Sequence, residues 1–109
     1  MAGNDPRGVL FALGLCAKAG KLITGVPMIT DAMRAGKKPC LVVAACDNAK
    51  NSEKKLGDKC SYYGVRLCTL DADGETLARA VGKTARLAAV AVTDENLCRL
   101  VLSKLEDTK

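Results

Sequence analysis

Apolar residues recur at helical spacing near both ends of the chain. In the first segment they are Val9, Leu13, Cys16 and Ala17. Asp5-Pro6 before this segment is typical of a helix start and Gly20 after it of a helix end, so we expect a helix between them. A last helix is predicted to open at 93–95, with its apolar stripe at Leu97, Leu100, Val101 and Leu105.

Between these helices the apolar residues form short continuous runs. The runs at 41–45 and 87–92 are typical of strands buried on both faces, and 22–23 and 65–70 predict two more strands. Amphipathic segments between the runs predict three further helices: one from Gly25 to Gly36, one over 48–63, and one capped by Asp73 that extends to Val81.

This alternation of helices and strands predicts an α/β fold. We expect a three-layer α/β/α sandwich with a mixed, largely parallel four-stranded sheet and helices on both of its faces. Linkers and repeats are absent from the sequence, so residues 1–109 are expected to form a single domain.

The net charge of +5 is unevenly distributed. Residues 1–60 contain ten Lys and Arg against five Asp and Glu, whereas the remainder contains seven of each kind. A one-sided basic excess favours an anionic partner such as nucleic acid, because it attracts phosphate and releases counterions. The alternative is that these lysines only keep the domain soluble.

Six cysteines would suit a disulfide framework in a secreted protein. The first residues have neither the basic nor the apolar segment of an export signal, and no apolar run is long enough to cross a membrane. We therefore expect a cytoplasmic protein with reduced, mostly buried thiols. There is no CxxC and no histidine, so the usual zinc spacings are absent and no metal or other cofactor is expected.

The sequence offers little for catalysis. Without histidine, Cys–His and Ser–His pairs are excluded. Cys46-Asp47-Asn48 follows a predicted strand, a favoured place for α/β active sites, but the simpler interpretation is that Cys46 fills the strand end and Asp47 or Asn48 caps the next helix. There is no P-loop or dinucleotide fingerprint either. We expect no enzyme and no small-molecule substrate.

Two loops are suited to binding phosphate. In Lys21-Leu22-Ile23-Thr24-Gly25 a glycine turn leads into a helix, whose free N–H groups and dipole attract anions. After the predicted helix that ends at Val81, Gly82-Lys83-Thr84 and Arg86 supply cations and a hydroxyl. Either could be an ordinary turn. With three aromatic residues the chain lacks the stacking platform used for single strands, so any RNA ligand is expected to be folded.

The segment 13–25 closely resembles the opening of the bacterial YlxQ-type branch of the ribosomal protein L7Ae family, the kink-turn RNA-binding superfamily. The resemblance covers about residues 8–105 and is carried by an ordered series of matches: 32–36, 41–44, Asp47, Asn51, Lys54, Lys55, 58–65, 77–83 and 90–94.

The resemblance implies an α/β/α sandwich that binds structured, kink-turn-like RNA without catalysis. The two loops would grip the bent RNA from two sides, and we expect the contacts to come from Lys21, Thr24, Gly25, Val26, Arg79, Lys83, Thr84 and Arg86. A cytoplasmic monomer that is ribosome-associated or accessory to translation is expected.

The sequence departs from the family pattern after Gly25. Archaeal and eukaryotic members carry a small residue and then Asn-Glu there, with a Lys on the same helix, whereas this chain has Val26, Pro27, Met28 and Asp31. Each lost bidentate base contact would cost about 1–3 kcal/mol. The alternative function is therefore a protein–protein interaction module on the same scaffold, in which Pro27 and Met28 belong to an apolar patch and RNA binding is weak or absent.

Overall fold

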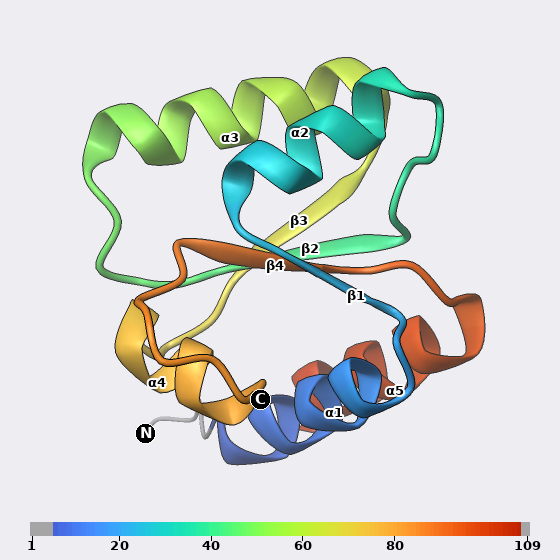
Figure 1. Ribbon diagram of the computed structural model, residues 1–109, viewed down its shortest axis with the longest axis vertical. Helices are drawn as coiled ribbons and strands as arrows, with labels where there is room; N and C mark the ends of the chain where they lie inside the picture. The colour runs from blue at the N-terminus through green and yellow to red at the C-terminus, as the bar shows by residue number, and fades with distance from the viewer. Residues whose placement is uncertain (1–5, 108–109) are drawn as a thin grey trace.

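The computed structural model describes residues 6–107 of the chain. Over this range five helices and four strands alternate (Figure 1). Their bounds are α1 (Arg7–Lys18), β1 (Leu22–Thr24), α2 (Val26–Arg34), β2 (Leu41–Ala44), α3 (Lys50–Tyr63), β3 (Arg66–Thr69), α4 (Gly74–Ala80), β4 (Ala89–Val92) and α5 (Glu95–Asp107).

The predicted elements are all present, with ends that differ by a few residues. Asp73 caps α4 as predicted, because its Oδ1 accepts the N–H of Thr76 at 2.8 Å. At the start of α5, Asp94 Oδ1 accepts the N–H groups of Asn96 and Leu97. Asp5, the predicted cap of the first helix, lies outside the described residues, and α1 begins after Pro6.

The sheet has the order β1-β4-β2-β3 and is mixed, but it is not largely parallel. β2 and β3 are parallel, whereas β4 lies antiparallel to both of its neighbours. The expectation of a largely parallel sheet is wrong because α4 does not carry the chain across the sheet. The N–H of Leu87 donates to the carbonyl of Gly74 at 3.1 Å, so the chain returns to the end of the sheet where α4 begins and enters β4 in the reverse direction.

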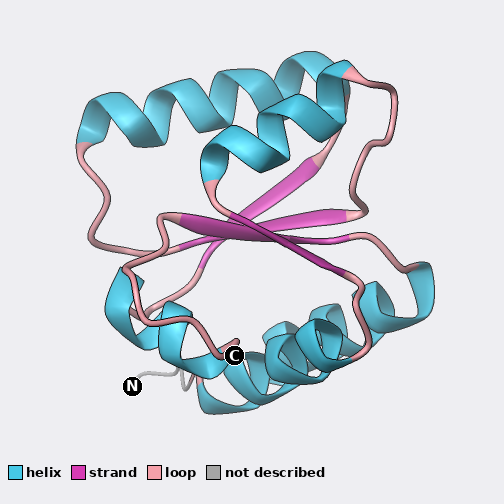
Figure 2. Ribbon diagram, viewed as in Figure 1, coloured by secondary structure: helices cyan, strands magenta, loops and turns pink. Residues whose placement is uncertain are grey.

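The helices cover both faces of the sheet and form three layers, as predicted. α2 and α3 lie on one face, and α1, α4 and α5 lie on the other (Figures 1 and 2). Because successive strand residues point to opposite faces, Val42 and Ala44 of β2 pack with Ile29 and Met33 of α2. The intervening β2 residues, Leu41 and Val43, pack with the α1 side. The sheet thus separates two hydrophobic cores.

α1 and α4 approach each other closely at Gly14. A Cβ atom at this position would lie 2.8 Å from the carbonyl oxygen of Ala80, so the contact depends on the missing side chain. Gly57, in the interior of α3, has no neighbouring atom within 4 Å of the corresponding point. The two helical glycines therefore offer a matched comparison.

We predict opposite effects of alanine at these two positions. Gly57→Ala should raise the free energy of unfolding by about 0.5–1 kcal/mol, because alanine is the better helix former. Gly14→Ala should lower it by about 1–2 kcal/mol, because the methyl group overpacks the α1–α4 contact. Urea denaturation of both variants measures the difference. A stabilised Gly14→Ala variant would contradict the close contact.

Candidate nucleic-acid interface

The Gly25 turn joins β1 to α2 at one end of the sheet. Gly25 has φ of +90°, a conformation that residues with a Cβ rarely adopt. Its N–H donates to the carbonyl of Ala89 in β4 at 3.0 Å, and its own carbonyl accepts the N–H of Ile29. The N–H of Gly25 is therefore used within the protein, and Pro27 has none. The first-turn amides that helix geometry leaves for an anion are those of Val26 and Met28.

The second predicted loop, residues 81–88, connects α4 to β4. Lys83 and Thr84 are exposed, and the N–H of Lys83 donates to the carbonyl of Ala78 at 2.8 Å, which closes the end of α4. Arg86, near the end of the loop, is half-exposed, with 42% of its side chain accessible.

Arg86 is anchored by residues that follow β2. Its Nη2 donates to Asp47 Oδ1 at 2.8 Å, to the Asp47 carbonyl at 3.2 Å and to Asn48 Oδ1 at 3.0 Å. Asp47 Oδ1 also accepts the N–H of Gly74 at 3.0 Å. These hydrogen bonds hold the pKa of the Asp47 carboxyl below its ordinary value, with the bond from Arg86 contributing more than the bond from Gly74. This network, which we call the Asp47 anchor (Asp47, Asn48, Gly74 and Arg86), connects three separate segments.

Asn48 extends the Asp47 anchor into the sheet. Its Nδ2 donates to the carbonyl of Ala88 at 2.9 Å and to that of Ala45 at 3.2 Å. The expectation that Asp47 or Asn48 caps the following helix is wrong, since α3 has Ala49 at its N-cap position and no side-chain cap. Their oxygens are bonded to Arg86 and Gly74 instead.

The two predicted loops meet at the start of β4. Ala88 is bonded to Asn48, and the next residue, Ala89, accepts the N–H of Gly25. Thr24, Gly25, Val26 and the Arg86 end of the loop therefore lie at the same end of the sheet. Lys21 lies at the opposite end of β1, where its carbonyl accepts both the N–H and the hydroxyl of Thr93. The length of β1, about 10 Å, separates Lys21 from the Gly25 turn.

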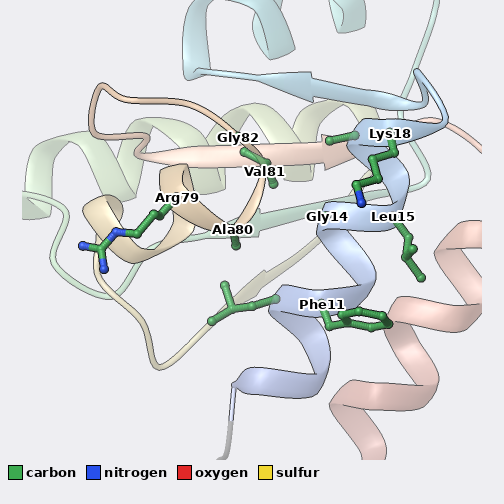
Figure 3. Close-up of a pocket in the computed structure, with 10 residues that line it drawn as sticks. Phe11, Gly14, Leu15, Lys18, Arg79, Ala80, Val81 and Gly82 are labelled. Atoms are coloured by element: carbon green, nitrogen blue, oxygen red, sulfur yellow. The ribbon is translucent and has the colours of Figure 1, made fainter.

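Arg79 belongs to a different neighbourhood. It lines a surface groove between α1 and α4, together with Gly82 and Lys18 (Figure 3). Of the predicted contact residues, the structure thus brings Thr24, Gly25, Val26 and Arg86 to one end of the sheet, with Lys83 and Thr84 earlier in the same loop as Arg86. The sequence did not indicate that Lys18 lines the same groove as Arg79. It also did not indicate that Asp47 and Asn48 anchor Arg86, because Arg86 is distant from both of them in sequence.

The cysteines do not form a cluster. All six are free, with three buried, two half-buried and Cys46 exposed at the end of β2. Burial raises the pKa of the thiols of Cys16, Cys60, Cys68 and Cys98, which keeps them protonated. Among the side chains that the structure describes, those of residues 6–105, no group of three or more acidic or cysteine residues could hold a metal ion. None of the helices in residues 6–107 is long and apolar enough to cross a membrane.

The fold and the site define an α/β/α domain that presents a glycine turn and a basic loop at one end of its sheet. The sequence profile of the ribosomal protein L7Ae/L30e/S12e/Gadd45 family matches residues 9–101. The chain belongs to this family. The resemblance read from the ordered motifs is thereby confirmed.

Relatives in two bacteria carry the name RNA-binding protein YlxQ. The protein from Bacillus subtilis is 34% identical over 94 residues, covering 86% of this chain and 91% of the relative. The protein from Enterococcus faecium is 36% identical over 81 residues, covering 74% and 76% of the two chains.

Two solved structures resemble most of the chain. A protein of unknown function from Bacillus halodurans C superimposes with a TM-score of 0.80 at 31% identity, covering 90% of this chain and 96% of that one. The Giardia lamblia 15.5kD RNA binding protein superimposes with a TM-score of 0.73 at 19% identity, covering 94% and 85%. At 19% identity, the comparison with the Giardia lamblia protein shows that the two proteins share a fold.

We predict that the Asp47 anchor stabilises the protein in a pH-dependent way. A carboxyl whose pKa is depressed by folding stabilises the fold above its unfolded-state pKa, and this contribution is lost as the pH falls through the folded-state value. Asp47→Asn should therefore lower the melting temperature at neutral pH, with the difference from wild type shrinking in acid.

Thermal denaturation at neutral pH and near pH 3 tests this prediction, with Asp71→Asn, a nearby exposed carboxylate, as the matched control. Hydrogen exchange at neutral pH should also be faster in residues 83–87 of the Asp47→Asn variant. A constant difference between wild type and Asp47→Asn at both pH values would contradict a role for the ionised carboxylate.

Proposed function

We propose that this protein binds structured, kink-turn-like RNA through the Gly25 turn and the loop that follows α4, and that it acts without catalysis. The observation that carries the proposal is the hydrogen bond from Gly25 to Ala89, which joins the turn to the strand that the loop enters. Two relatives named as RNA-binding proteins, each at least 34% identical, support the same ligand class.

The chemistry of the two loops suits a phosphate backbone. Lys83 and Thr84 are exposed and supply a cation and a hydroxyl, while helix geometry leaves the first-turn amides of Val26 and Met28 for an anion. Arg86 makes its three bonds through one nitrogen, Nη2, whereas a guanidinium has five N–H groups. The side chain therefore keeps donors for an RNA oxygen while Asp47 fixes its direction.

Helix α2 determines how specific this binding is. Pro27 and Met28 are exposed, with 61% of Met28 accessible, and neither side chain can hydrogen-bond a base edge. Asp31 is also exposed and pairs with Arg34 at 3.5 Å. Recognition of bent RNA would then rest on backbone shape and on the loop after α4, with weaker discrimination between bases.

The wider role that we propose is cytoplasmic, as a monomer associated with the ribosome or accessory to translation. The full set of RNA contacts comprises Lys21, Thr24, Gly25, Val26, Arg79, Lys83, Thr84 and Arg86. Since Lys21 and Arg79 lie apart from the Gly25 turn, they would contact RNA beyond the bend itself. An interaction module without RNA binding is the competing function, and salt dependence separates the two, because phosphate contacts weaken steeply as salt rises.

We predict that Lys83→Ala weakens binding to a kink-turn RNA by about threefold to tenfold near physiological salt. Each phosphate contact contributes a slope of about 0.9 or less to the dependence of log Kd on log salt concentration. The variant should therefore also lower that slope by about 0.7–0.9. Fluorescence anisotropy at several salt concentrations measures both quantities.

The matched control for Lys83→Ala is Lys59→Ala, which removes an exposed lysine from the C-terminal half of α3. It should leave affinity and slope almost unchanged. Equal losses from both variants would indicate general attraction to the basic surface and would remove Lys83 from the proposed interface. Wild-type binding that does not vary with salt would contradict RNA binding altogether.

We also predict that the triple change Pro27→Asn, Met28→Glu and Asp31→Lys tightens kink-turn binding. Asn restores a backbone N–H and adds polar groups, Glu supplies an acceptor for guanine, and Lys replaces repulsion of phosphate with attraction. The charge reversal alone should contribute about 1 kcal/mol at low salt, and less at high salt.

Titration of wild type and triple variant against one kink-turn RNA, at two salt concentrations, tests this prediction. Because Asp31→Lys breaks the pair with Arg34, the melting temperature of the variant is measured in parallel. Equal, tight binding by both proteins would show that the missing side chains are unnecessary. No binding by either would favour the protein-interaction function.

A further inference from the structure

The groove between α1 and α4 is a second concave surface, distinct from the Gly25 turn. It encloses about 490 Å³. Its base lies where Gly14 approaches Ala80, because the missing side chain lets the helices touch there. The groove is lined by Leu10, Phe11, Gly14, Leu15, Ala17, Lys18, Arg79, Ala80, Val81 and Gly82 (Figure 3).

The α1 wall of the groove exposes large apolar side chains. Phe11, the only phenylalanine of the chain, is 69% exposed, and Leu15, one helical turn later, is 37% exposed. Adjacent apolar side chains beside a groove mark an interaction surface more specifically than single ones do. The other large apolar side chains exposed within residues 6–107, Met28 and Tyr62, lie on α2 and α3, on the opposite face of the sheet.

The charges beside the groove have one sign. Among the described residues that line it, the charged ones are Lys18 on α1 and Arg79 on α4, and both are exposed. Figure 3 shows Lys18 on the same helix as Phe11 and Leu15, whereas the guanidinium of Arg79 is directed away from α1. The groove thus combines an apolar wall with a basic residue, Lys18, at the C-terminal end of the same helix.

We propose that this groove binds an acidic amphipathic helix from a partner protein. From Phe11 to Lys18 the α1 wall is about 10 Å long, which matches two turns of a docked helix. Apolar side chains of the partner would pack against Phe11 and Leu15, in the manner of other helix-in-groove complexes. Its carboxylates would pair with Lys18, which sets the charge of the partner and steers its approach.

An RNA occupant suits the groove less well than it suits the two loops. Phosphates would have to lie against Phe11, Leu15 and Leu10, where no donor replaces their hydration. The inference adds a second kind of partner to the proposed RNA function and does not depend on it. A protein segment here and RNA at the Gly25 turn could be bound together.

The test is a selection of random peptides, about fifteen residues long, displayed on phage and applied to the full-length protein. Peptides retained by a Phe11→Gln, Leu15→Gln double variant are removed first. We expect the surviving sequences to be amphipathic and net acidic. A synthetic peptide of the consensus sequence should then shift the backbone amide resonances of Gly14, Leu15, Val81 and Gly82.

Single variants examine each part of the proposal with that consensus peptide. Phe11→Gln should weaken binding by about tenfold or more, as expected for an aromatic anchor. Lys18→Glu should weaken binding of the acidic peptide. The same variant should strengthen binding of a second peptide in which lysine replaces each acidic residue. Tyr62→Gln, which removes an even more exposed aromatic side chain from α3, is the matched control and should change the affinity for neither peptide.

Several results would overturn the proposal. One is a selection in which no peptide binds the wild-type protein better than the double variant. Another is a set of selected peptides that are basic or uncharged. A third is a kink-turn RNA titration in which Phe11→Gln loses as much affinity as Lys83→Ala, which would make the groove part of the RNA site. The last is a concentration-dependent dimer, seen by light scattering and abolished by Phe11→Gln, which would make a second copy the occupant.

Discussion

The ion pair between Asp47 and Arg86 holds the loop after α4 against the end of β2. It connects the end of β2 to a loop 39 positions later in the sequence, and Asp47 also holds the N-terminus of α4 through Gly74. A side chain at Gly74 could not be accommodated, because a Cβ there would lie 2.5 Å from Cγ of Arg86 and 2.9 Å from the carbonyl of Leu87. Close packing and charge therefore act on the same three segments, and both bring the loop back to the end of the sheet where α4 began.

The direction of β4 follows from this return. Because β4 enters between β1 and β2 in the reverse direction, its first residues lie beside the end of β1, where Gly25 begins the turn into α2. A parallel β4 would place the loop after α4 at the other end of the sheet from Gly25. The proximity of the two candidate RNA-binding segments is thus a property of the topology, and the Asp47 anchor maintains it.

Patterns within short segments were sufficient to predict the elements and the layers. The apolar runs at 41–45 and 87–92 reveal β2 and β4, and the glycines after the helices mark where these end. The direction of β4 was not predictable in this way, because it depends on the contact of Leu87 with Gly74. Similarly, Asp47 and Asn48 look like helix caps in the sequence, and only their distance from Arg86 in space reveals their other role. The groove was missed for the same reason, since Gly14 shows its function only beside Ala80.

The two outer strands of the sheet have a consequence for how the protein meets other molecules. β1 has only three residues, and β3 carries the exposed residues Arg66 and Thr69 at its two ends. A short edge on one side and a charged one on the other are poor templates for an added strand. Edge-to-edge aggregation is thereby disfavoured. Association through the helices and loops is favoured instead, and those surfaces can be tuned without disturbing the sheet.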